Sequence, residues 1–258
     1  MNKFDDDAIV SKIHQRTDCS EYLRILFGER QIGPLDFVQL ARHCASVTQT
    51  PVPPFKAFRR FERLWTLLRF QLYALQTCRG PLAECGVFRG FSGLAMGLLM
   101  KAVAERCQTT SSDLWLIDSY SGLSEPAPDD WIVQCIGGEP VSGPSMKKGH
   151  FAASLKTVER HFTEIKNAKF AKGWIPDVFD SLPVSEWSFV HIDVDLHEPV
   201  GDCLKYFYPK LEKGGVIIND DFNSPLFPGA GKVWREFFDD KDKGYAILDT
   251  GQAVYINS

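Results

Sequence analysis

From about residue 80 onward, the chain alternates short apolar runs with stretches of helical periodicity, and this alternation constrains the fold more than any other feature. Strands that alternate with helices predict a largely parallel sheet, because each parallel connection needs a crossover that a helix can supply. The last run is interrupted by Thr250 and Gly251, which predicts an antiparallel hairpin at the C-terminus. The apolar runs read PLAECGVF, DLWLIDSY, NAKFAKGW, WSFVHIDVD, GGVIINDD and YAILDTGQAVYIN.

The chain before residue 80 has a different organisation. Residues 1–54 mix short helical patterns with polar connections and end in the proline-rich TQTPVPPF, so we expect a helical cap or lid joined by a stiff linker to a main domain of residues 55–258. The segment FKAFRRFERLWTLLRFQLYALQ then places large apolar residues three and four apart. This spacing favours a core-packing helix, with its arginines in solvent, over a binding groove.

Composition excludes several classes of protein. With 258 residues, 44% of them hydrophobic, the chain can form one large α/β domain with an added cap. A formal net charge of -4 provides no basic field for DNA or RNA. The seven cysteines form no C-x-x-C pair, the N-terminus is acidic, and no apolar run reaches the length of a membrane span. We therefore expect a reduced, cytoplasmic protein that binds neither nucleic acid nor a membrane.

The first candidate site is AECGVFRGFSG, where an apolar run meets a helical pattern. Glu84, Gly86 and Gly90 lie at this turn. Glycine lets the backbone approach a ligand closely, and the start of a helix presents N–H groups that lack partners within the helix. The segment is neither a G-x-G-x-x-G dinucleotide motif nor a P-loop. Simple packing of strand against helix is an equally good reading of these glycines.

Acidic residues end the following strands. Asp118 ends LWLIDSY, where a carboxylate can accept hydrogen bonds from both ribose hydroxyls of an adenosine-containing ligand, or can cap the next turn. Asp193 and Asp195 follow one later strand, and Asp220 and Asp221 follow the next. If those strands are neighbours, their carboxylates converge and repel one another unless a cation neutralises them. Oxygen-only ligands favour Mg²⁺, and Ca²⁺ or Mn²⁺ are the alternative ions. The alternative without a metal is a solvated rim of acids with helix caps.

Two histidines lie near these acids. His191 lies deeper in the strand, which favours a core or supporting role. His197 follows the strand end, so we consider it for a role in the site. We expect Asp195 in a supporting role, as a cap of the next helix.

Five motifs, taken in order, resemble the macrocin-type sugar O-methyltransferases of antibiotic biosynthesis. They are ECGVFRG, IDSYSGL, GWIPDVFDSLP, HIDVDLHEP and YFYPKLEKGGVIINDD, spread over about residues 80–240. The resemblance implies a Rossmann-like methyltransferase fold with S-adenosylmethionine as the methyl donor. It also implies dependence on Mg²⁺ and a sugar hydroxyl of a glycosylated small molecule as the acceptor.

Carried over residue by residue, the resemblance assigns the site. Asp193, Asp220 and Asp221 correspond to the metal-binding carboxylates, and Asp193 also to the general base. His197 stands where we expect a tyrosine in the family, so the base role is open between Asp193 and His197. The residues expected at the donor are Glu84, Cys85, Gly86, Val87, Arg89, Ser92, Asp118, Ser119, Gly173, Trp174 and Asp193.

Three other functions are consistent with parts of the pattern. One is a catechol-type O-methyltransferase with a flat aromatic acceptor, and a second is a methyltransferase-like binding protein without catalysis. A metal-dependent hydrolase of phosphate esters also needs clustered carboxylates. Residues 124–151 are rich in proline and glycine, which predicts an irregular, mobile loop over the site. The apolar N-terminal helices are compatible with a homodimer or a higher homo-oligomer.

Overall fold

The computed structural model describes residues 27–50, 54–109, 111–136, 139–241 and 243–258. About half of the predicted N-terminal cap, residues 1–26, and residues 51–53 of the predicted linker lie outside the described residues. None of the described helices is long and apolar enough to cross a membrane. The described cysteines carry free thiols.

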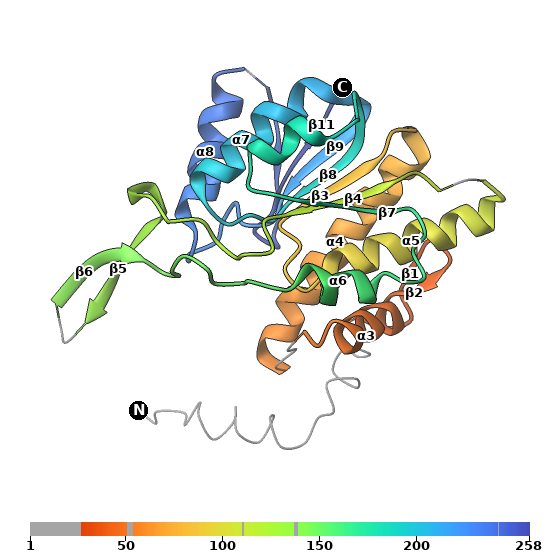
Figure 1. Ribbon diagram of the computed structural model, residues 1–258, viewed down its shortest axis with the longest axis horizontal. Helices are drawn as coiled ribbons and strands as arrows, with labels where there is room; N and C mark the ends of the chain where they lie inside the picture. Colours follow the sequence, from red (N-terminus) through yellow and green to blue (C-terminus); the bar gives the residue numbers. More distant parts are fainter. Residues whose placement is uncertain (1–26, 51–53, 110, 137–138, 242) are drawn as a thin grey trace, which may run out of the picture.

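A seven-stranded sheet forms the centre of the fold, in the order β10-β11-β9-β8-β3-β4-β7 (Figure 1). The pairs β9–β8, β8–β3, β3–β4 and β4–β7 are parallel, whereas β11 is antiparallel to both β9 and β10. The predicted parallel sheet and C-terminal hairpin are confirmed. The strands are β3 (Leu82–Cys85), β4 (Leu114–Asp118), β7 (Ala168–Lys172), β8 (Trp187–Ile192), β9 (Leu211–Asn219), β10 (Ala246–Ile247) and β11 (Ala253–Ile256).

Helices cover both faces of this sheet, so the domain has three layers (Figure 1). One face packs against α3 (Phe37–Val47), α4 (Pro54–Thr77), α5 (Phe91–Cys107) and α6 (Leu155–His161). The other face packs against α7 (His197–Phe207) and α8 (Pro228–Asp239). The short 3-10 helices are η1 (Pro128–Asp130), η2 (Asp177–Ser181) and η3 (Tyr208–Lys210).

Alternation along the strands divides the core into two hydrophobic clusters. Successive strand residues point to opposite faces, so Leu82 joins the cluster under α4 and α5, whereas Ala83 joins the cluster under α7 and α8. On β8, Phe189 and Val190 divide in the same way. Because both faces are covered, the central strands β3, β4 and β8 are mostly apolar instead of alternating apolar with polar residues.

The described part of the predicted cap packs into the same core. Residues 31–36 form the short hairpin β1 (Gln31–Ile32) and β2 (Leu35–Asp36), and α3 follows directly. The Asp36 carboxylate accepts a hydrogen bond from the backbone N–H of Gln39 at 2.8 Å, which caps α3. Phe37 and Cys44 of α3 are fully buried beside α5.

Residues 124–151 contain regular structure, so the prediction of an irregular loop was wrong. β5 (Trp131–Ile136) and β6 (Glu139–Pro144) form an antiparallel hairpin that projects from the body of the domain (Figure 1). The signal was present in the sequence, because the six-residue run WIVQCI precedes Gly137 and Gly138, a pair typical of two-residue hairpin turns.

The order in which strands are added to the sheet reverses at the central strand β3, and this reversal locates the crevice of the fold. β4 and β7 lie on one side of β3, whereas β8 and β9 lie on the other. Ligands of open parallel sheets bind at such a reversal, beyond the carboxyl ends of the strands. Gly86 follows β3 here with a φ of +87°, and a Cβ on it would lie 1.8 Å from the backbone oxygen of Asp193. Only glycine therefore allows the β3 and β8 loops to touch.

We predict that Gly86→Ala lowers the free energy of unfolding by roughly 3 kcal/mol, because the new methyl group overlaps rigid backbone in a left-handed conformation. Urea denaturation measures the change. Gly143→Ala is the matched control, since a Cβ at Gly143 would meet nothing within 4 Å and should leave stability nearly unchanged. Equal stability of the two variants would contradict the close approach of the loops.

Candidate functional site

A cavity of about 690 Å³ opens at the carboxyl ends of β3, β4, β8 and β9. Its wall combines the turn after β3, the loops after the other strands and one side of α4. The sequence-predicted residues that line the cavity are Gly86, Ser92, Asp118, Ser119, Gly173, Trp174, Asp193, Asp220 and Asp221.

Asp118 organises the turn after β3 from the end of the neighbouring strand. Its Oδ2 accepts hydrogen bonds from the backbone N–H groups of Val87 and Phe88, at 2.6 and 3.0 Å. Its Oδ1 accepts one from the N–H of Tyr120 at 2.6 Å, which caps the following turn. The turn-capping alternative is therefore present in the structure. The carboxylate nevertheless lines the cavity, where a ribose would compete for it.

Four other residues expected at the donor do not line the cavity. The Glu84 carboxylate is fully buried and faces Nδ1 of His191 at 3.0 Å. Cys85 is buried on the α7 side of the sheet, and Val87 contributes its backbone N–H to Asp118. Arg89 turns outward and donates to the backbone oxygen of Gln49 at 2.7 Å. These side chains shape the turn and do not line the cavity.

Gly173 and Trp174, which follow β7, complete this half of the cavity. The N–H of Gly173 donates to the backbone oxygen of Asp118 at 3.0 Å. Trp174 is 43% exposed although it lines the cavity. A large aromatic ring at a cavity mouth provides a flat apolar surface for a ligand.

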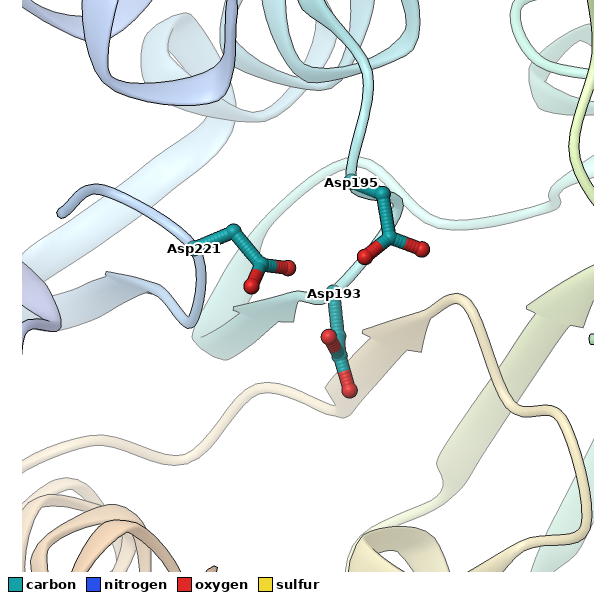
Figure 2. A group of neighbouring side chains, drawn as sticks. All are labelled: Asp193, Asp195 and Asp221. Carbon is teal, nitrogen blue, oxygen red and sulfur yellow. The ribbon is translucent and has the colours of Figure 1, made fainter. Parts of the chain in front are cut away.

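Three carboxylates gather on the opposite side. One oxygen each from Asp193, Asp195 and Asp221 lies within 4.8 Å of the others, and Figure 2 shows the three side chains beside the ends of β8 and β9. Asp221 is only 6% exposed, and its Oδ2 has no hydrogen-bond partner. Its backbone N–H donates to Oδ1 of Asn219 at 3.0 Å, which holds the loop in place. A buried carboxylate oxygen without a donor fits a cation.

Crowding raises the proton affinity of this carboxylate cluster. Burial, followed by the charges of Asp220 and Asp221, raises the pKa of Asp193 well above its usual range. Burial, followed by the charges of Asp221 and Asp193, does the same to the pKa of Asp195. Burial and the charge of Asp220 raise the pKa of Asp221 to about 6. Protons or a cation must therefore neutralise the cluster near neutral pH.

Asp220 points to other partners, although it was predicted as a metal ligand. Arg63 Nη1 donates to its Oδ2 at 2.8 Å, Gln252 Nε2 donates to its Oδ1 at 2.7 Å, and His191 Nε2 lies 3.6 Å from that Oδ1. Burial alone would raise the pKa of Asp220, but the charges and hydrogen bonds of these partners hold it below its usual range. The structure thus groups Asp195, not Asp220, with Asp193 and Asp221.

Asp195 does not have the predicted capping role. The first residue of α7 is His197, and its backbone N–H donates to Oδ1 of Asp130 at 2.8 Å. Asp195 itself has a φ of +63°, which turns the chain before the helix starts. This turn brings the Asp195 carboxylate into the cluster.

The prediction that the arginines of α4 lie in solvent holds for Arg59, Arg60 and Arg69, which are exposed, but not for Arg63. Arg59, Arg60 and Arg63 line the cavity, and the Arg63 side chain is only 20% exposed. Arg63 also lies 3.7 Å from Asp221 and donates to the backbone oxygen of Thr250 at 3.3 Å. Helical periodicity identifies the apolar stripe but not what covers its flanks. The available signal was a basic run, Arg59-Arg60, in a chain whose strand ends carry paired acids.

The two histidines have different surroundings. His191 is buried between Glu84 and Asp220, in the predicted supporting position. His197 Nε2 faces Glu236 at 3.6 Å and Asp129 at 3.9 Å, and the residue does not line the cavity. The structure therefore does not bring His197 to the carboxylate cluster.

We predict that His191 makes the metal-free protein less stable as the pH rises from 7 to 9. Burial alone would lower the pKa of His191, but Asp220 and Glu84 raise it to about 10. The unfolded chain loses this proton near pH 6.5, so each further pH unit up to 10 favours unfolding by at most about 1.4 kcal/mol. His191→Gln should remove this part of the slope in urea denaturation, whereas His43→Gln, at a 52% exposed side chain, should keep it. An unchanged slope in His191→Gln would contradict the assignment.

Comparison with known proteins agrees with the motifs in the sequence. The model of the macrocin-O-methyltransferase (TylF) family matches residues 59–248. Demethyldecarbamoylnovobiocin O-methyltransferase of Streptomyces niveus is 28% identical over 169 residues, which cover 64% of this chain and 61% of the relative. Mycinamicin III 3''-O-methyltransferase of Micromonospora griseorubida is 27% identical over 161 residues, or 61% of each chain. The chain thus spans about three fifths of the length of these curated relatives.

Solved structures share the fold. The O-methyltransferase NovP superposes with a TM-score of 0.61 at 21% identity, covering 77% of this chain and 80% of its own. CalS11, a calicheamicin methyltransferase, superposes with a TM-score of 0.60 at 17% identity, covering 84% of this chain and 91% of its own. The predicted Rossmann-like methyltransferase fold is confirmed, and because the family model spans most of the chain, this protein belongs to the macrocin-O-methyltransferase (TylF) family.

Proposed function

We propose that this protein transfers a methyl group from S-adenosylmethionine to a hydroxyl of a sugar or glycosylated small molecule, with Mg²⁺ in the site. The observation that carries the proposal is the carboxylate cluster of Asp193, Asp195 and Asp221, in the same cavity as the glycine turn after β3. Membership of the TylF family supports the reaction class, and the names of the relatives describe O-methylation of natural products.

The donor would occupy the half of the cavity formed by β3, β4 and β7. Gly86 and Ser92 line this half, and Ser92 lies in the first turn of α5, whose N-cap is Gly90. A glycine cap has no side chain that could accept hydrogen bonds from the first N–H groups of the helix. Those N–H groups could therefore bind the carboxylate of S-adenosylmethionine. Asp118 and Ser119 provide polar groups for a ribose, and Trp174 provides an apolar face.

The carboxylate cluster has the chemistry that a hard divalent cation requires. Its ligands are all oxygen, and the orphaned Oδ2 of Asp221 lacks any other partner. When bound, Mg²⁺ lowers the pKa of a coordinated hydroxyl. Asp220 would support the site from behind, because Arg63 and Gln252 already bind it.

Asp193 would be the general base. It lines the cavity beside the proposed cation, where a carboxylate oxygen can accept the proton of the acceptor hydroxyl. His197 has no role in this proposal, because its ring faces Glu236 and Asp129. The chain's contribution would be orientation of the two substrates and removal of one proton.

Calorimetry with S-adenosylhomocysteine tests the proposal. We expect binding by the intact protein, and a gain of one methyl group when hydroxylated sugars, glycosides and catechols are offered with S-adenosylmethionine and analysed by mass spectrometry. A folded protein that does not bind S-adenosylhomocysteine would exclude a methyltransferase and would favour the hydrolase alternative. Methylation of catechols alone would favour the aromatic acceptor.

We predict that Asp221→Asn lowers turnover at least about 100-fold and weakens Mn²⁺ binding, since it removes a ligand charge from the cluster. Affinity for S-adenosylhomocysteine should stay within about threefold, because the donor half does not contain Asp221. Asp240→Asn, at a side chain that is 82% exposed, is the matched control and should behave like the wild type. Turnover that persists in Asp221→Asn or in excess chelator would refute the metal role.

A further inference from the structure

Asp130 is a buried acid that lies outside the sheet and has no part in the chemistry proposed above. It ends η1, immediately before the hairpin β5–β6, and only 3% of the residue is exposed. Both of its carboxylate oxygens accept backbone hydrogen bonds, Oδ1 from the N–H of His197 at 2.8 Å and Oδ2 from the N–H of Ala127 at 3.1 Å. A buried carboxylate that is bonded in this way holds together the segments whose N–H groups it binds.

The Asp130 carboxylate lies at the first turns of two helices. His197 is the first residue of α7, and Gly229 is the second residue of α8. A Cβ on Gly229 would overlap Oδ1 of Asp130, so the glycine leaves the space that the carboxylate occupies. Among the described residues, neither N-cap, Leu196 of α7 or Phe227 of α8, caps its own helix with a side-chain hydrogen bond. Asp130 therefore brings an acceptor and a negative charge to two helix starts that lack side-chain caps of their own.

The turn that ends at His197 carries one of the three clustered carboxylates. It starts at Asp193, whose N–H donates to the backbone oxygen of Cys85 at 2.8 Å, and it ends at the bond from His197 to Asp130. Asp195 lies between these two attachments with its φ of +63°, and Figure 2 shows its carboxylate in the cluster. A left-handed conformation is unfavourable at a residue with a side chain, so it persists only where surrounding contacts hold the turn.

The loop that carries Asp221 ends at the same place. It leads into α8 at the N-cap, Phe227. Phe227 and Leu196 belong to a small hydrophobic cluster, and Met146 packs against this cluster from the segment after the hairpin. The chain on both sides of the hairpin therefore contacts the two loops that carry the acids, by hydrogen bonds before β5 and by apolar packing after β6.

We propose that Asp130 is a positioning residue for the cation site. Its bond to the N–H of His197 holds the left-handed turn at Asp195, and its contact with Gly229 fixes the start of α8 and with it the loop after Asp221. The proposal rests on the function proposed above and gives the segment before the hairpin a role in it. Residues that orient the ligands of a metal without touching the ion commonly contribute about 10- to 100-fold to its affinity.

Metal and donor affinities of the full chain test this role separately. Binding of Mn²⁺ is followed by electron paramagnetic resonance, and binding of S-adenosylhomocysteine by calorimetry. Asp130→Ala removes the acceptor of the His197 N–H, so Mn²⁺ affinity should fall about tenfold or more, while affinity for S-adenosylhomocysteine stays within about threefold. Asp130→Asn keeps an oxygen for this bond and should retain Mn²⁺ affinity to within about threefold.

Two further variants locate the effect. Gly229→Ala keeps the acid, but its methyl group would displace the carboxylate, so Mn²⁺ affinity should fall as it does in Asp130→Ala. Asp129→Ala is the matched control, because the Asp129 side chain is 43% exposed and pairs with Lys232 at 2.6 Å. This variant should bind Mn²⁺ like the wild type. If Asp130→Ala does not fold, Gly229→Ala and Asp130→Asn decide the question.

Two results overturn the proposal. One is Mn²⁺ affinity that stays unchanged in both Asp130→Ala and Gly229→Ala. The other is an equal loss of affinity for Mn²⁺ and for S-adenosylhomocysteine, because a general loss of structure affects both ligands.

Failure of the proposed function is read separately. Absence of Mn²⁺ binding by the wild type would refute the metal site itself, and amide hydrogen exchange of the metal-free protein then decides the role of Asp130. Exchange in residues 194–200 should be about tenfold or more faster in Asp130→Ala than in the wild type and in Asp130→Asn, while exchange in β3 and β4 stays unchanged. Equal exchange of residues 194–200 in all three proteins would overturn the proposal.

Discussion

The ion pair between Arg63 and Asp220 is the interaction on which the rest of the site depends. Two neighbouring parallel strands end in acids, so the fold concentrates negative charge at one point, and desolvation makes that charge costly. Arg63 reaches Asp220 at 2.8 Å from a helix on one face of the sheet, with side chains 20% and 15% exposed. Such a pair contributes little net stability, yet removal of one partner costs about 3 to 5 kcal/mol because the other charge remains buried.

The same pair connects four elements that are distant in sequence. Asp220 follows β9, Arg63 belongs to α4, His191 lies on β8, and Gln252 precedes β11 and binds both Asp220 and the backbone of Arg63. Glu84 on β3 extends the connection through His191. One buried polar network therefore joins β3, β8, β9 and α4 beneath the cavity.

Chemically identical carboxylates acquire different properties from this arrangement. Cationic partners lower the pKa of Asp220, whereas burial and neighbouring negative charge raise the pKa of Asp193, Asp195 and Asp221. Environments that separate the pKa values of like groups are how a site assigns different roles to them. Asp220 stays ionised beside Arg63, whereas the other three carboxylates need protons or the proposed cation to offset their charge.

The alternating apolar runs were sufficient to predict the sheet, its C-terminal hairpin and the strand ends at Asp118, Asp193 and Asp221, because periodicity and strand order are local properties of the chain. The orientation of single acids was not predictable in this way. β8 ends at Ile192, and the positive φ of Asp195 then turns the chain before α7, so Asp195 joins the cluster instead of capping the helix. Asp220 is turned by Arg63, 157 positions away.

The orientations of Asp195 and Asp220 were not predictable for a common reason: they depend on loops and on contacts between segments that are distant in sequence. The donor half consists of strand ends and a glycine turn, and its contacts are largely between backbone groups or to a carboxylate at a strand end, as at Asp118 and Gly173. The opposite half of the cavity, where the acceptor would bind, includes α4 and the loop at residues 224–227, which do not belong to the strand ends. Their exposed side chains, unlike Arg63 and the buried leucines of α4, can change without disturbing the sheet, since no strand register depends on them. Differences in acceptor between members of such a fold should therefore arise from α4 and this loop.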